Sequence, residues 1–111
     1  MTIDDRLKLI ALQALDRLEP ATIDELVYEI QSRAVAEGVL PQSQAVKLER
    51  VYVGRDLIAN WERTDPPLVQ QTDYRPDELA PTGAPLRHAQ SRFELTEAGE
   101  AEMQRLDRSA D

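Results

Sequence analysis

The side chains of this sequence that could carry chemistry are a few carboxylate pairs, one histidine and scattered arginines. Paired carboxylates can act as acid and base, but Asp24 and Glu25 stand at an expected helix start, where the helix dipole favours them. The other pairs have the same position or lie on expected solvated faces: Asp4/Asp5 and Glu100/Glu102. His88 lies in a Pro-rich stretch without a neighbouring histidine or cysteine, so no metal site is predicted. Without a Gly-rich phosphate loop or a G-x-S-x-G segment, we expect neither an enzyme nor a bound cofactor.

Charge sets one segment apart from the rest of the chain. The formal net charge is −8 and the pI is about 4.6. Residues 44–63 hold four basic and three acidic side chains, whereas residues 1–43 hold four basic and eight acidic ones. An acidic protein repels phosphate at long range, so specific binding of nucleic acid would need a local basic patch. Residues 44–63 are the only segment whose charge permits one.

Arginine supplies most of the positive charge, because lysine occurs only as Lys8 and Lys47. Two explanations remain open. A GC-rich genome favours arginine codons, and an acidic, lysine-poor surface also suits the salt-rich cytoplasm of a halophilic organism. In such a cytoplasm, long-range repulsion between the protein and phosphate would be screened.

Length and composition indicate one soluble domain, residues 1–111. Hydrophobic residues make up 41% of the chain, which is enough for one core, and no apolar run is long enough to span a membrane. The acidic start of the chain does not resemble a signal peptide. We therefore expect a cytoplasmic protein.

The first half of the chain predicts two amphipathic helices. In the first, residues 4–18, apolar residues recur every three or four positions on one face. Leu9 and Leu12 lie off that face, and the pattern leaves open whether they are exposed, extend the core or form a dimer seam. The second helix begins with a capping box of Thr22 and Glu25 and runs to about residue 37, where Gly38 is placed to end it.

The stretch from Ser43 to Arg63 predicts one long helix, which the rest of the chain surrounds. It contains no proline, and its apolar side chains cover more than half of its circumference. A helix of that kind must be covered on more than one side. Tyr52 and Trp61 are interpreted as core residues. The apolar residues of this helix are Val46, Leu48, Val51, Tyr52, Val53, Leu57, Ile58 and Trp61.

The second half predicts two short strands and a last helix. Leu68–Thr72 and Arg92–Leu95 have strand-like patterns, and residues 73–91 between them, with three prolines and no periodicity, predict a flexible loop. The final helix covers about residues 96–107 and is too short to stand alone. The predicted fold class is mainly α with a small two-stranded β wing (α+β), in the order helix, helix, helix, strand, strand, helix.

This order and two local motifs resemble the winged helix-turn-helix superfamily of bacterial and archaeal regulators. The segment A-T-I-D-E-L at 21–26 is similar to the start of the supporting helix of those proteins. The segment R-F-E-L-T-E-A-G-E-A-E-M at 92–103 resembles the end of their wing, where a strand reading Y/F-x-L-T passes into a helix starting E-x-G. The wing here would span about residues 68–95. The predicted supporting helix and the turn after it are both longer than is usual in the family.

The resemblance implies duplex DNA as the partner, with the helix 43–63 in the major groove and the wing on the backbone or the minor groove. It also implies a small transcriptional regulator that binds half-sites as a homodimer, with a seam from Leu9 and Leu12 or from Met103 and Leu106. The residues that would contact DNA are Ser43, Gln44, Lys47, Arg50, Arg55, Arg75, Arg87 and Arg92.

A second interpretation uses the same fold for protein–protein contact, as an acidic interaction module or a mimic of DNA phosphates. The net charge of −8 favours this reading over DNA binding. Geometry discriminates between the two. A DNA reader needs its arginines clustered on the third helix and the wing, whereas a protein binder would present an acidic or apolar patch there.

Overall fold

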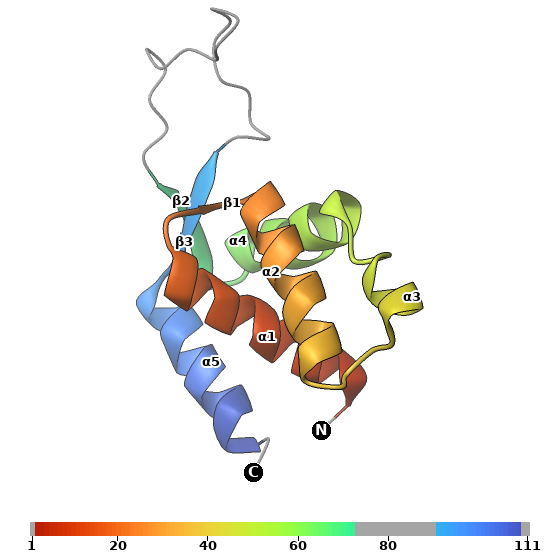
Figure 1. The fold of residues 1–111 in the computed structure, drawn as a ribbon. Helices are drawn as coiled ribbons and strands as arrows, with labels where there is room; N and C mark the ends of the chain where they lie inside the picture. The colour runs from red at the N-terminus through yellow and green to blue at the C-terminus, as the bar shows by residue number, and fades with distance from the viewer. Residues whose placement is uncertain (1, 73–90, 110–111) are drawn as a thin grey trace, which may run out of the picture.

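The computed structural model describes residues 2–72 and 91–109. In this part the chain is mainly helical, with a small three-stranded antiparallel sheet, and none of its helices is long and apolar enough to cross a membrane. Figure 1 shows the arrangement. The elements are α1 (Ile3–Leu18), β1 (Ala21–Thr22), α2 (Ile23–Ala36), α3 (Gln42–Ala45), η1 (Val51–Ala59), α4 (Asn60–Glu62), β2 (Val69–Thr72), β3 (Arg92–Leu95) and α5 (Glu97–Ser109).

The first two helices begin and end as their sequences predict. At the start of α2 the backbone N–H of Glu25 donates to the Thr22 hydroxyl at 3.2 Å, and the Glu25 carboxylate accepts from the Thr22 N–H at 3.3 Å. This reciprocal pair satisfies two N–H groups that a helix start leaves free. Gly38, just after α2, has a φ of 70°, the left-handed conformation that glycine adopts without steric cost. Both predictions are confirmed.

The single helix predicted for Ser43–Arg63 is wrong. The short α3 ends at Ala45, the chain turns through residues 46–49, and helical structure resumes at Arg50, continuing as η1, with wide π-helical turns, and α4. The side-chain amide of Gln31, on α2, donates to the backbone carbonyls of Val46 at 3.4 Å and of Leu48 at 3.1 Å. These bonds replace intrahelical partners that the two carbonyls would have in a continuous helix. Leu48 itself is buried in the core.

The sheet has three strands, and the prediction of two was incomplete. The strand order is β1-β3-β2, so β3 pairs with both neighbours. Phe93 lies opposite Ala21 of β1 and Gln71 of β2. Two residues are too few to show the alternation that identifies a strand, so β1 had no sequence signal. The strand prediction at Arg92–Leu95 is confirmed. The predicted loop at 73–91 lies outside the described residues, apart from Ser91.

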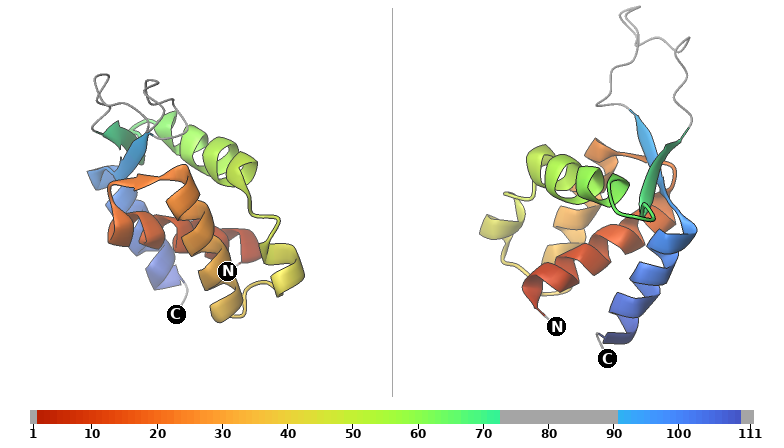
Figure 2. Two further views of the ribbon diagram at one scale, coloured as in Figure 1. Left: turned by 45° about the horizontal axis from the view of Figure 1, so that its top comes forward. Right: turned by 180° about the vertical axis from the view of Figure 1, so that it is seen from behind.

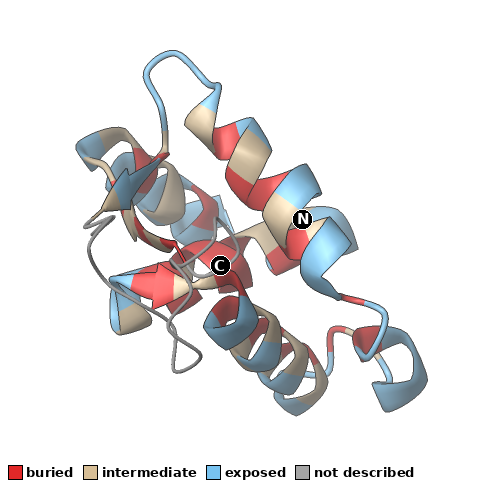
Figure 3. Ribbon diagram, turned by 90° about the horizontal axis from the view of Figure 1, so that it is seen from above, coloured by how far each residue is buried: buried red, intermediate tan, exposed pale blue. Residues whose placement is uncertain are grey.

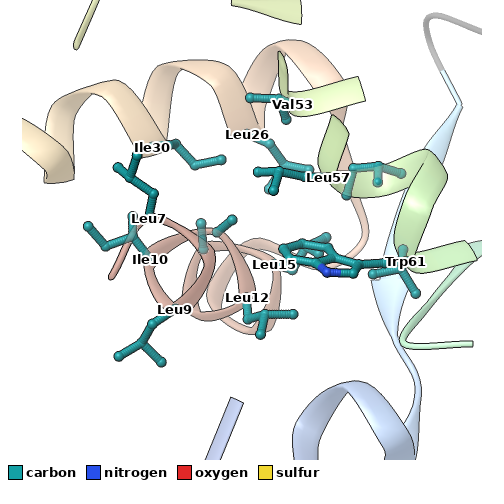
Figure 4. Close-up of a cluster of buried hydrophobic side chains, with 14 of the residues drawn as sticks. Leu7, Leu9, Ile10, Leu12, Leu15, Leu26, Ile30, Val53, Leu57 and Trp61 are labelled. Atoms are coloured by element: carbon teal, nitrogen blue, oxygen red, sulfur yellow. The ribbon is translucent and has the colours of Figure 1, made fainter. Parts of the chain in front are cut away.

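The core lies where α1, α2 and the η1–α4 helix meet. Leu15 of α1, Leu26 of α2 and Leu57 of η1 are buried there, together with Trp61 of α4 (Figure 4). The core role predicted for Trp61 is confirmed. In Figure 3 the buried residues lie mostly on the sides of the helices that face one another.

The last helix, α5, packs against α1 within the same chain. Leu9 and Leu12 of α1 and Leu106 of α5 are buried, and Met103 is half-buried against the core. Of the three readings left open for Leu9 and Leu12, extension of the core is therefore correct. The same burial removes Leu9, Leu12 and Leu106 from the predicted dimer seam, because a single chain already covers these three side chains, whereas Met103 is only partly covered.

Gly99 makes the close docking of α5 possible. A Cβ atom at this position would lie 2.1 Å from the backbone oxygen of Leu68 and 3.1 Å from a methyl group of Leu95. The same Leu68 oxygen accepts the Thr96 N–H at 3.0 Å, just before α5 begins. Only a residue without a side chain allows the backbones to approach this closely.

We predict that Gly99→Ala destabilises the protein by about 2 kcal/mol or more, because the added methyl group forces the two backbones apart. Urea unfolding followed by circular dichroism measures the change. The matched control is Gly54→Ala in η1, where the new Cβ would lie 3.8 Å from Ile23 in ordinary contact. That variant should gain about 0.5–1 kcal/mol from lower backbone entropy in the unfolded chain. Equal stability of the two variants would contradict the account of Gly99.

Candidate nucleic-acid interface

The η1–α4 helix has one covered side and one exposed side. Seen from behind in Figure 2, it crosses in front of α2 and ends beside β2. The exposed side chains are Val51, Arg55, Asp56 and Asn60, and the inner side buries Val53, Leu57, Ile58 and Trp61. Exposed positions separated by four and five residues fall on one side of a helix whose turns are wider than 3.6 residues. The π-helical turns thus select which side chains face outward.

Two apolar side chains of this region are more exposed than the sequence predicts. Val51 is 60% exposed and Val46 is 45% exposed. Both were assigned to the apolar face of a continuous helix. The break at 46–49 removes Val46 from that face, and the wide turns carry Val51 to the outside. The helix is therefore less completely covered than expected.

The residues predicted to contact DNA are only partly brought together. Ser43 and Gln44 are exposed on α3, and Lys47 is exposed in the connection that follows. Arg50 and Arg55 are exposed near the start of η1 and on its outer side, whereas Arg92 of β3 is half-buried. Arg75 and Arg87 lie outside the described residues.

Two of the four cations on this segment are held by carboxylates. Arg50 reaches Asp24 at the start of α2, with 3.1 Å between nitrogen and oxygen, and Arg55 pairs with the adjacent Asp56 at 2.9 Å. The hydrogen bond to Asp56, and then its negative charge, raise the pKa of Arg55 above its ordinary value. These pairs are exposed, so each contributes little to stability. They nevertheless reduce the positive potential that the segment presents.

The other two cations keep their charge uncompensated within the part of the chain that the structure describes. Neither Lys47 nor Arg63 forms an ion pair there, and both side chains are exposed. On this surface Lys47 and Arg63 could therefore bind a phosphate directly, whereas Arg50 and Arg55 are already paired with carboxylates in the described part of the chain. Arg63 lies just beyond α4, at the end of the helix nearest to β2.

Sequence reasoning missed two contributors to this surface. Asn60, exposed on α4, donates its side-chain amide to the backbone oxygen of Asp56 at 3.0 Å. The sequence already placed Asn60 on the polar side of the helix. It gave no sign of the wide turns that bring Asn60 to the same side as Val51 and Arg55. Asp24 was interpreted only as a helix-start residue. Its contact with Arg50 joins residues 26 positions apart, so no local pattern could reveal it.

Tyr52 lies half-buried on the same helix and carries an enclosed polar group. Its hydroxyl is fully enclosed and has no hydrogen-bond partner among residues 2–72 and 91–109. Burial is the main cause that raises the pKa of the Tyr52 phenol above 10.0, and the nearby charges of Asp4 and Asp56 raise it further. An enclosed polar group without a partner costs free energy.

Three exposed carboxylates converge elsewhere, at the junction of α1, α5 and the sheet. The carboxylate oxygens of Asp16, Glu19 and Glu100 lie within 4.8 Å of one another. Glu19 has a structural role, because its carboxylate accepts the backbone N–H of Leu95 at 2.9 Å, at the end of β3. Exposed acidic groups of this kind are ordinary on an acidic surface, and nothing further identifies a cation site.

The comparisons with known proteins add no family to this picture. No family model matches the chain, and neither the curated proteins nor the solved structures contain a match. The assignment of function therefore depends on the residues and their geometry.

We predict that alkaline pH destabilises the protein partly through Tyr52. The folded state holds the phenolic proton more tightly than the unfolded chain, whose tyrosine titrates near 10.0. The unfolded state therefore loses its proton first, and the free energy of unfolding falls as pH rises above about 10. Tyr52→Phe should reduce that fall and change stability at pH 7 by less than about 1 kcal/mol, since the hydroxyl has no partner to lose among the residues that the structure describes. Tyr28→Phe is the control, because Tyr28 is 73% exposed. The measurement is urea unfolding at pH 7 to 11, and equal pH profiles for the two variants would refute the role of Tyr52.

We predict that Gln31→Leu loosens the connection between α3 and η1. The substitution removes both hydrogen bonds to the carbonyls of Val46 and Leu48 and should cost about 1–2 kcal/mol. Backbone amides of residues 46–50 should exchange with solvent faster in hydrogen-exchange experiments. Ser32→Ala, at the exposed neighbouring position of α2, provides the control. Unchanged exchange in the Gln31 variant would show that the break is held by packing alone.

Proposed function

We propose that this protein is a small winged helix-turn-helix regulator that binds duplex DNA. In this proposal α2 supports the reading surface, which α3 and the η1–α4 helix form, and β2 and β3 form the base of the wing. The predicted motifs at 21–26 and 92–103 coincide with the start of α2 and with the passage from β3 into α5. That correspondence supports the fold assignment.

The observation that carries the proposal is the exposed side of the η1–α4 helix. It faces away from the core and, beside Asp56, presents an arginine, an amide and an apolar side chain on one side of the helix: Arg55, Asn60 and Val51. The surrounding segment, residues 44–63, carries a net charge of +1, while the chain as a whole carries −8. A major-groove reader needs these three kinds of side chain, because they match phosphates, base edges and thymine methyl groups.

Each residue of this surface has a chemical role in the proposal. Lys47 and Arg55 would neutralise phosphates, and the hydroxyl and amide of Ser43 and Gln44 would bond phosphate oxygens. Asn60 would read adenine, and Val51 would contact a thymine methyl group. The remaining proposed contacts come from Arg50 and Arg63 and, on the wing, from Arg92, Arg75 and Arg87.

The alternative proposal is an acidic protein-interaction module or DNA mimic. The observation that favours it is the pairing of Arg50 with Asp24 and of Arg55 with Asp56. Carboxylates at a DNA-facing surface repel phosphates, and a protein partner would tolerate both signs of charge. In the first proposal the exposed arginines contact DNA phosphates, and in the second they contact a protein partner.

We also propose a homodimer, because one short domain contacts too little DNA for high specificity and paired half-sites remedy this. The dimer would need a surface other than the one that joins α1 and α5. Val46 and Val51 are exposed, but they belong to the proposed reading surface.

We predict that the protein binds DNA from upstream of its own gene in fluorescence anisotropy titrations, with affinity that falls as salt rises. Arg55→Ala should weaken binding and reduce the slope of log K against log salt by about 1, because one phosphate contact is lost. Asp56→Asn should strengthen binding, since it removes a repelling carboxylate. Arg108→Ala is the control, an exposed arginine near the end of α5.

Each outcome separates the two proposals. Saturable binding that unrelated DNA does not displace, with the expected order of the variants, would support a DNA reader. Absence of binding at low salt, where electrostatic attraction is strongest, would favour the protein-interaction module. Equal effects of Arg55→Ala and Arg108→Ala would place the DNA contact elsewhere on the protein.

A further inference from the structure

A second feature of the molecule is a cavity between α1, the end of α4 and α5, on the inner side of the proposed reading helix. Its volume is about 220 Å³. Pockets for drug-sized ligands span roughly 300–1,000 Å³, so a molecule that fits here must be small. We refer to it as the α1–α5 cavity. Its apolar wall is formed by Leu12, Trp61, Leu68 and Leu106.

Charged groups of both signs surround this apolar wall. Lys8 and Asp5 come from α1, and Arg105 and Glu102 come from α5. Each of the two helices therefore contributes one cation and one carboxylate to the cavity. The hydrogen bond and charge of Glu102 raise the pKa of Arg105, and Asp5 adds a smaller contribution. Asp5 is thus close enough for its charge to reach the guanidinium.

The charged groups remain partly accessible to solvent. Lys8 forms an ion pair of 3.1 Å with Asp4, and its side chain is 41% exposed. Arg105 pairs with Glu102, one turn before it on α5. Exposed pairs of this kind are weak, so a ligand with matching charges can replace them at small cost. A fully buried pair would resist such exchange.

Trp61 brings an unused hydrogen-bond donor to the wall. Among the described residues its indole N–H has no acceptor. The Tyr52 hydroxyl is the one enclosed side-chain atom that lacks a partner in this part of the chain, so the indole nitrogen is not enclosed. In Figure 4 the nitrogen lies on the edge of the ring that faces α5. Trp61 is buried, and the N–H of a buried tryptophan usually donates a hydrogen bond to a partner.

We propose that the α1–α5 cavity binds a free α-amino acid with a branched apolar side chain. The carboxylate of the ligand would lie between Lys8 and Arg105, and its ammonium group would meet Asp5 and Glu102. The apolar side chain would pack against Trp61 and Leu68. A zwitterion satisfies both signs of charge at once, whereas a purely anionic or cationic ligand would leave one pair of groups opposed.

The proposal does not depend on DNA binding, and its test contains no DNA. Trp61 is the only tryptophan, so intrinsic fluorescence reports directly on the cavity wall. We expect L-leucine to change the fluorescence of the full-length protein saturably, with a millimolar dissociation constant, as suits a ligand of about nine non-hydrogen atoms. Thermal unfolding provides a second measurement, since a ligand that binds only the folded state raises the melting temperature.

Two analogues and three variants test the recognition. 4-Methylpentanoate lacks the amino group and 3-methylbutylamine lacks the carboxylate, and each should bind at least about fivefold more weakly than L-leucine. Arg105→Gln and Glu102→Gln should weaken L-leucine binding to a similar extent. Arg108→Gln, on the same helix but outside the cavity wall, should leave it unchanged.

Several results would overturn the proposal. One is the absence of both a fluorescence change and a thermal shift with about 50 mM L-leucine. Another is equal binding of either analogue, which would show an apolar crevice without recognition of charge. Equal weakening by Arg108→Gln and Arg105→Gln would show a general electrostatic effect of the acidic surface.

Discussion

The packing around α1 is the constraint on which the rest of this structure depends. Ile10 and Leu12 of this helix are both almost completely covered, although residues two apart point to opposite sides of a helix. One face meets α2 and the η1–α4 helix, and the other meets α5. A helix that is apolar on two faces must be covered on both, since each leucine left in water would cost about 2 kcal/mol. The docking of α5, and with it the close approach at Gly99, follows from this requirement.

The same core determines how the η1–α4 helix is presented. Leu48, Val53 and Leu57 all enter the core from this segment. The chain accommodates them with a break at 46–49, which Gln31 stabilises, and with wide turns after it. The cost is visible in two exposed valines and in the Tyr52 hydroxyl, which finds no hydrogen-bond partner in the described part of the chain. Wide helical turns are often found at functional sites, and here they decide which side chains face solvent.

One helix thereby contributes to two surfaces with different chemistry. Asn60 faces solvent beside Arg55, while the next residue, Trp61, lies in the core and lines the α1–α5 cavity. Binding of a ligand in the cavity would therefore contact the same helix that presents the proposed reading surface. The acidic character of the chain has a local consequence too, because Asp24 and Asp56 compensate the arginines nearest to them. The net charge of the chain therefore does not show which of its cations are already paired with carboxylates.

Sequence alone determined the elements whose signals are local. The capping box at Thr22, the left-handed Gly38 and the alternation at Arg92–Leu95 each depend on neighbours a few residues away, so the start of α2, its end and β3 could be predicted. Only the tertiary structure decided the break in the long helix, the strand β1 and the burial of Leu9 and Leu12. It also decided the pairing of Arg50 with Asp24. These features arise from contacts between distant segments, where the free energy of covering the core outweighs the local preference for a straight helix.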